Sequence, residues 1–166
     1  LHGYYAAGAY TDANVGRVLA ELDRLGLRDS TIVAFWADHG WHLGEQNYWG
    51  KLTNFEVGTR VPLMISVPGL AGMDSDALIE LVDVYPTLAE LCGLSAPKNL
   101  QGHSVAAHLG QRSLLGKQAA YSQYPRKEAS TDNESLMGYS MRTDRFRYTE
   151  WLRGDGSLRD AELYRS

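Results

Sequence analysis

The sequence has 166 residues, with 16 Lys and Arg against 20 Asp and Glu, and 44% of it is apolar. A chain of this length buries roughly two-thirds of its unfolded surface and can therefore form a domain with a core. The weakly acidic balance, without a Lys/Arg cluster, argues against a nucleic-acid partner. No apolar run reaches the roughly 20 residues that cross a bilayer, so we expect no membrane span.

The ends of the sequence do not look like natural ends. It opens at Leu1 without Met and already inside a helical pattern, and it stops just as an apolar segment begins at Leu163. Nothing at the start resembles a signal peptide. We therefore expect the chain to be a piece of a longer protein.

The first third predicts a helix followed by a strand. Apolar residues recur at offsets of three and four, and Gly26 lies where a helix would end, which predicts a helix over about 4–25. The recurring residues are Val15, Val18, Leu19, Leu22 and Leu25. The run at 30–37 is short and rich in branched and aromatic residues, as in a parallel strand covered on both faces. A helix that leads into such a strand indicates an α/β fold.

The residue pattern of the rest of the chain changes near Pro97. A second apolar run at 61–67 predicts another strand, and 78–91 resumes a helical pattern interrupted by Pro86. The segments 119–124, 137–142 and 146–152 are short and alternating, with Thr143 and Asp144 placed for a tight turn. We therefore expect an α/β part over 1–96 and a small antiparallel α+β subdomain over 97–166.

The triplet Asp38-His39-Gly40 is the sharpest chemical feature. Neighbouring side chains on a strand point to opposite faces, so Asp38 and His39 can converge on one ion only if the backbone turns there. Gly40 supplies the freedom for that turn. The C-terminal mouth of a buried strand is where α/β sheets hold ligands, which favours a divalent cation. An Asp that caps the next helix, with His39 as its neighbour, is the alternative.

Other polar residues on the chain allow two interpretations each. The spacing of His39, His42 and Glu45 differs from that of helical zinc peptidases, and the flanking glycines oppose a helix. Lys51 follows aromatic residues and could bind a small oxyanion or lie in solvent. Arg126 could recognise a carboxylate or lie at the surface. Glu56 and Arg60 are four apart and could pair across one helical turn.

Taken in order, these motifs resemble the later part of a sulfatase of the alkaline phosphatase superfamily. The resemblance covers nearly the whole chain. It is closest to the iduronate 2-sulfatase branch because of two motifs in the tail. The resemblance rests on these motifs: Tyr10–Gly16, Asp38–Glu45, the segment around Lys51, Arg60–Leu63, Val82–Leu88 and the tail motifs Ala120–Arg126 and Met137–Thr143.

The resemblance implies hydrolysis of a sulfuric ester in a sulfated saccharide, as in glycosaminoglycan degradation. Asp38 and His39 match metal ligands of the family, which normally hold Ca²⁺, although another divalent metal is possible. Lys51 matches a lysine that binds the sulfate, so His39 and Lys51 are the expected catalytic groups. Trp41 and Arg126 are hypothesised to help Lys51 in substrate binding, with Arg126 on a uronic acid carboxylate.

The nucleophile of the family is a formylglycine made from the Cys of Cys-x-Pro-Ser-Arg, and the sequence lacks that motif. Cys92 does not match it. We therefore expect the nucleophile and the other metal ligands in a preceding N-terminal segment, which would be this chain's partner, and expect the chain alone to be inactive. The family also implies a periplasmic, secreted or lysosomal protein.

Two alternatives remain at this point. One is a phosphate or phosphonate ester hydrolase of the same superfamily, in which an Asp-His pair helps to bind zinc. The other is a sulfatase-like binding module without catalysis. Lys51 and the tail motifs favour sulfate over phosphate.

Overall fold

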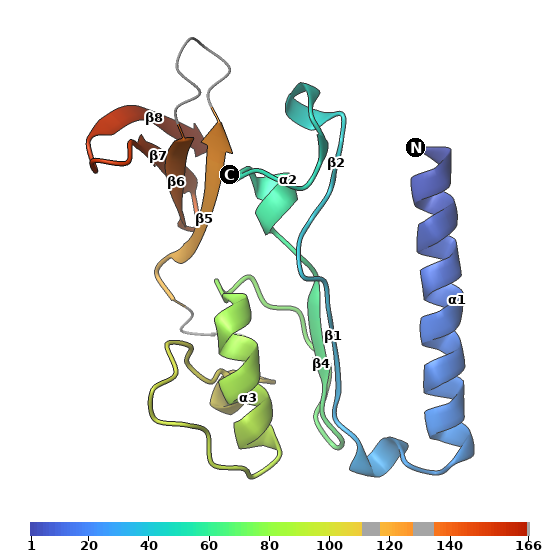
Figure 1. The fold of residues 1–166 in the computed structure, drawn as a ribbon. Coiled ribbons are helices and arrows are strands. Elements are labelled where there is room, and N and C mark those ends of the chain that lie inside the picture. The colour runs from blue at the N-terminus through green and yellow to red at the C-terminus, as the bar shows by residue number, and fades with distance from the viewer. Residues whose placement is uncertain (111–116, 128–134, 166) are drawn as a thin grey trace. The chain divides into compact units, whose positions relative to one another are not determined.

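A computed structural model of the protein describes residues 1–110, 117–127 and 135–165. Within these ranges the chain forms two compact units, which are described separately: Leu1–Trp36 with Pro62–Gly72, and Ala37–Val61 with Met73–Ser166. Figure 1 shows the elements in chain order: α1 (His2–Arg24), β1 (Val33–Trp36), β2 (His42–Leu43), β3 (Trp49–Gly50), α2 (Glu56–Thr59), β4 (Leu63–Ser66), α3 (Val84–Leu91), β5 (Ala120–Lys127), β6 (Ser135–Arg142), β7 (Phe146–Leu152) and β8 (Leu158–Arg165). Short 3₁₀ turns lie at Arg28–Ser30, Glu45–Asn47, Leu81–Asp83 and Ala106–His108.

The first unit begins with α1, which confirms the predicted helix. Gly26 has a φ of +67°, and the amides of Gly26 and Leu27 donate to the carbonyls of Asp23 and Leu22. This is the glycine-terminated helix end that satisfies the last carbonyls of a helix. The predicted apolar face is only half-buried at Val15, and Val18 is exposed. None of the described helices is both long and apolar enough to cross a bilayer.

The strands β1 and β4 confirm the two predicted apolar strands, but the expected parallel pairing is wrong. Val33 faces Ser66 and Trp36 faces Leu63, so the two strands run antiparallel. The expectation that the first strand is covered on both faces is also wrong in this structure, because Phe35 and Trp36 are exposed. An apolar run is typical of buried parallel strands, but what it reports directly is a tendency to be buried and not the direction of the neighbouring strand.

The second unit contains a four-stranded antiparallel sheet in the order β5-β6-β7-β8 (Figure 1). The turn predicted at Thr143 and Asp144 joins β6 to β7, and the Thr143 amide donates to the Phe146 carbonyl over 2.8 Å. One face of the sheet buries alternate residues of β6 and β7. Those residues are Leu136, Gly138, Ser140, Arg147, Thr149 and Trp151. Half of this face is polar, so its side chains need hydrogen-bond partners inside the fold.

The helical pattern predicted at 78–91 forms the 3₁₀ turn Leu81–Asp83 and α3. Pro86 does not interrupt the helix, since it lies in the first turn of α3, where amides have no partner within the helix. The strand β8 was not predicted. The division of the chain at Pro97 stays a prediction.

Candidate functional site

The Asp38-His39-Gly40 triplet lies on a backbone turn just after β1, which ends at Trp36. The Gly40 amide donates to the carbonyl of Gly58 in α2 over 2.9 Å. A Cβ atom at Gly40 would lie 1.8 Å from the Val57 carbonyl oxygen. No real side chain fits there, so the close approach of α2 requires glycine.

His39 is held in one tautomer by its neighbours. Its Nδ1 lies 2.9 Å from the Gly40 carbonyl oxygen, which can only accept, so Nδ1 carries the proton. Nε2 is then left with a lone pair, and the Lys51 ammonium donates to it over 2.7 Å. A metal-binding histidine has this arrangement, with one nitrogen fixed by a backbone carbonyl and the other free to bind.

The carboxylate of Asp38 faces the same nitrogen. Its Oδ2 lies 3.4 Å from Nε2 of His39, and the Asp38 side chain is 84% exposed. Two lone-pair atoms repel each other unless a cation lies beside both. The separation suits two neighbouring ligands that are each about 2.4 Å from one cation. The structure therefore brings Asp38, His39 and Lys51 together around a point that favours positive charge.

The pair fits one side of a divalent cation site. No group of three or more His, Cys, Asp or Glu residues among the described residues could enclose a metal ion. Ca²⁺ takes six to eight oxygen ligands, so Asp38 and His39 can supply only part of such a shell.

Trp41 and His42 follow the triplet and lie in different environments. The Trp41 ring lies 6.4 Å from the His39 ring and is 42% exposed, so it can meet a ligand. His42 is fully buried, and its Nε2 lies 2.8 Å from the Thr53 hydroxyl. The carboxylate of Glu45 accepts from the Leu43 amide, and this hydrogen bond holds the Glu45 pKa below its ordinary value. His42 and Glu45 thus serve the local fold.

Arg126 lies on β5 and already has partners. Its guanidinium stacks 3.9 Å above the Trp151 ring and lies 3.5 Å from Glu162 and 3.9 Å from Asp160. Arg126, Trp151 and Glu162 line a cavity of about 180 Å³ together with Leu52–Phe55, the segment that follows Lys51. Arg126 is therefore near the Lys51 segment, but two acids share its charge.

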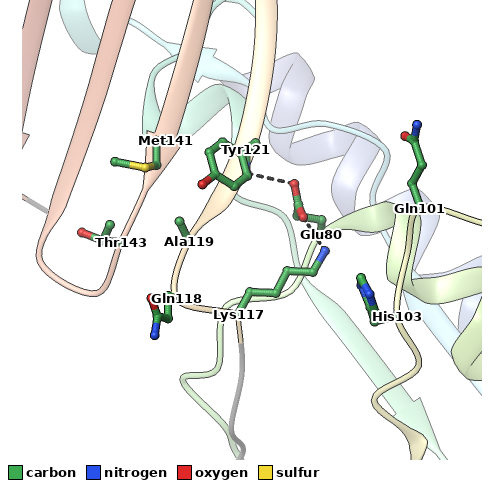
Figure 2. A pocket seen from close by; sticks show the side chains of 9 residues that line it. All are labelled: Glu80, Gln101, His103, Lys117, Gln118, Ala119, Tyr121, Met141 and Thr143. Atoms are coloured by element: carbon green, nitrogen blue, oxygen red, sulfur yellow. Dashed lines mark hydrogen bonds and ion pairs between the residues drawn. The ribbon is translucent and has the colours of Figure 1, made fainter.

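A second hollow, of about 630 Å³, is lined in part by Lys117 and Glu80, two members of an ionic cluster (Figure 2). Lys117 forms ion pairs with Glu80 and, over 2.9 Å, with Asp83. The Asp83 side chain is 1% exposed and also accepts from the amides of His103 and Glu80. Burial raises the pKa of Asp83, but the His103 amide and Lys117 outweigh it and hold that pKa below its ordinary value. These groups fix the chain around α3, so we read the hollow as structural.

Sequence reasoning missed the partners of Glu56 and the role of Asn54. Glu56 does not form the suggested pair with Arg60 but binds Arg147 over 2.7 Å and Arg142 over 3.2 Å. Asn54 is buried and donates to the Gly138 carbonyl over 3.1 Å. These partners lie more than 80 positions away, so no spacing rule could find them.

Comparison with known proteins defines the class. The family model described as Sulfatase matches residues 1–94. The chain belongs to the sulfatase family. It is 38% identical to iduronate 2-sulfatase of Mus musculus over 93% of the chain and 37% identical to that of Homo sapiens over 90%. It is also 32% identical to arylsulfatase K of Rattus norvegicus over 97%. The chain spans 38%, 37% and 29% of these relatives' lengths.

Solved structures give the same picture of the fold. A protein solved with its substrate D-glucosamine-2-N,6-O-disulfate matches with a TM-score of 0.77 and 30% identity, over 93% of this chain and 31% of that one. A phosphonate monoester hydrolase from Silicibacter pomeroyi matches with a TM-score of 0.79 and 26% identity, over 93% and 32%. The predicted α/β fold of the alkaline phosphatase-like sulfatases is thus confirmed, as is the resemblance to iduronate 2-sulfatase.

Proposed function

We propose that the full-length protein is a sulfuric ester hydrolase that acts on a sulfated saccharide. The observation that carries this proposal is the convergence of the Asp38 carboxylate, the His39 Nε2 lone pair and the Lys51 ammonium at one point in a sulfatase-family chain. A cation beside an anion-binding ammonium is the pairing that a sulfate ester requires, since charge builds up on oxygen as its bond to sulfur breaks.

Asp38 and His39 would hold a divalent metal, for which we propose Ca²⁺. When bound, the metal would neutralise charge on the sulfate and help to activate the nucleophile. His39 supplies Nε2 because its Nδ1–H is held by the Gly40 carbonyl. That nitrogen has one lone pair, so Lys51 cannot donate to it while it binds a metal. Lys51 then donates to a sulfate oxygen instead. The formylglycine nucleophile would come from a segment outside this sequence.

The substrate class is supported by the relatives. One similar structure was solved with a sulfated glucosamine as its substrate, and the curated relatives include iduronate 2-sulfatases. The exposed Trp41 ring beside His39 suits the apolar face of a sugar. By family resemblance, we also propose a periplasmic, secreted or lysosomal location and a preceding sulfatase segment as the chain's partner.

The proposal is tested by sulfate-release turnover of the full-length protein on a panel of sulfated saccharides, with added Ca²⁺ or Zn²⁺. We expect turnover on at least one sulfated sugar and a preference for Ca²⁺. Turnover on phosphonate monoesters but not on sulfates, with a preference for Zn²⁺, would favour the phosphonate hydrolase alternative, which one similar structure represents. Saccharide binding with no turnover on any ester would favour the binding module.

Arg126→Gln is expected to raise the KM for sulfated uronic acid substrates about 10-fold, which is the value of one charge-assisted hydrogen bond. The KM for a neutral aryl sulfate should change less than twofold, because that substrate offers no carboxylate. The measurement compares both KM values in the full-length protein. Equal changes for the two substrates would show that Arg126 only supports Trp151 and Glu162.

A further inference from the structure

We infer that Arg147 of β7 is a positioning residue for the proposed sulfatase site: through Glu56, it fixes the turn that carries Asp38 and His39, while Asn54 ties the segment that carries Lys51 to the same sheet. This inference rests on the proposed function. Its evidence is a chain of contacts within the second unit, none of which involves the reacting groups themselves.

The first contact joins the sheet to α2. The Arg147 side chain is 7% exposed, and its Nη2 donates to Glu56 Oε2 over 2.7 Å, with Nε of the same residue at 3.3 Å. Nη1 of Arg147 donates to the Ser140 hydroxyl over 2.9 Å, which fixes the guanidinium in its plane. Burial raises the pKa of Glu56, but Arg147 and Arg142 together hold it below its ordinary value, so Glu56 is ionised at neutral pH.

The second contact joins α2 to the turn that carries Asp38, His39 and Gly40. Glu56 is the first residue of α2, and two residues later the Gly58 carbonyl accepts the Gly40 amide over 2.9 Å. Since Gly40 has no room even for a Cβ atom against Val57, a shift of α2 must move the turn with it. His39 is adjacent to Gly40, so its ring would follow.

The third contact fixes the segment that carries Lys51. Asn54 donates to the Gly138 carbonyl over 3.1 Å, and a Cβ atom at Gly138 would lie 2.6 Å from that amide nitrogen. The Thr53 amide donates back to the Lys51 carbonyl over 2.9 Å, and the Thr53 hydroxyl lies 2.8 Å from His42. Asn54 therefore holds the Lys51 segment against the sheet, and Glu56 holds the turn that carries Asp38 and His39 against the same sheet.

The link between β7 and the turn of Asp38 and His39 depends most on the charge of Glu56. Two guanidiniums, of Arg142 and Arg147, share one of its oxygens, and Nη1 of Arg142 is buried without a hydrogen-bond partner in the described part of the chain. Removing the Glu56 charge leaves both cations without a counter-charge, and a buried cation in that state reorganises its surroundings. Displacement of reacting groups by about 1 Å can cost 10²-fold in rate.

The test uses the full-length protein with Glu56→Gln, Glu56→Asp and Arg147→Lys. The matched control is Glu80→Gln, which removes a carboxylate from the separate Lys117 cluster. Each variant is measured for kcat and KM on a sulfated saccharide, for Ca²⁺ affinity by titration calorimetry, and for thermal melting.

We expect Glu56→Gln and Arg147→Lys to lower kcat by about 10-fold or more and to weaken Ca²⁺ binding several-fold, because Gln carries no charge and an ammonium cannot reproduce the forked contacts of Arg147 with Glu56 and Ser140. Glu56→Asp should recover most of both, since it keeps the carboxylate. Glu80→Gln should lower the melting temperature while kcat and Ca²⁺ affinity stay within twofold. If Glu56→Gln and Arg147→Lys reduce only the melting temperature, as the control does, the positioning role is wrong.

The proposed function can fail separately. If the unmodified protein releases no sulfate from any substrate, that proposal falls, and the positioning inference is then decided by Ca²⁺ affinity alone. Unchanged Ca²⁺ affinity in Glu56→Gln would overturn it in that case.

Discussion

Lys51→Ala is expected to lower kcat for sulfate release by about 10²–10³-fold, which is the cost of removing one fixed donor from the place where charge develops. Lys51 is exposed, and its ammonium contacts Nε2 of His39 beside the Asp38 carboxylate. Its side chain supports little of the fold, so the melting temperature should hardly change. The measurement is sulfate-release turnover of the full-length protein, together with a melting curve.

The matched control for this variant is Lys98→Ala, which removes an exposed lysine far along the sequence. The control should keep full turnover. Turnover in Lys51→Ala within threefold of the unmodified protein would exclude Lys51 from the chemistry and would leave the site without its anion-binding group.

Asp83→Ala should destabilise the folded protein by about 2–3 kcal/mol, because donors that lose a buried acceptor are left without a hydrogen-bond partner. Lys117 would lose one of its two carboxylates, and the amides of His103 and Glu80 would lose their acceptor. Since Asp83 also closes the capping box of the 3₁₀ turn Leu81–Asp83, we expect the loss to show as a lower urea midpoint and a lower melting temperature of the full-length protein.

Asp74→Ala is the matched control, because it removes an exposed aspartate from the same unit. A change of less than about 0.5 kcal/mol is expected there. If the two variants were equally stable, the Lys117 cluster would contribute nothing measurable to folding.

The sequence predicted the elements whose signal is local. The period of apolar residues and Gly26 were enough for α1, and alternation with a turn at Thr143 was enough for β6 and β7. β8 was missed because its apolar residues do not alternate with polar ones: Leu158 and Leu163 are exposed, and the half-buried position is Glu162. A turn around Gly156, which has a φ of +81°, was the signal that could have revealed the hairpin.

In the candidate site, too, the sequence predicts the local part and not the contacts made by tertiary packing. Asp38 and His39 are adjacent and Lys51 follows twelve residues after His39, so their approach depends on local structure. Gly40 is needed at the turn, but because α2 packs closely against it and not for a positive φ. The roles of these residues in catalysis stay a prediction. The links from Glu56 to β6 and β7 depend on tertiary packing, and no pattern within a window of residues contains them.

The tight fit of Gly40 against Val57 has a consequence for interpreting related genes. Backbone crowding alone requires the glycine, so any chain that folds this way needs it whether or not an ion binds beside it. The exposed carboxylate of Asp38 has no comparable role in packing. In a related chain, loss of this carboxylate with the glycine retained would remove the proposed cation ligand and leave the backbone turn intact.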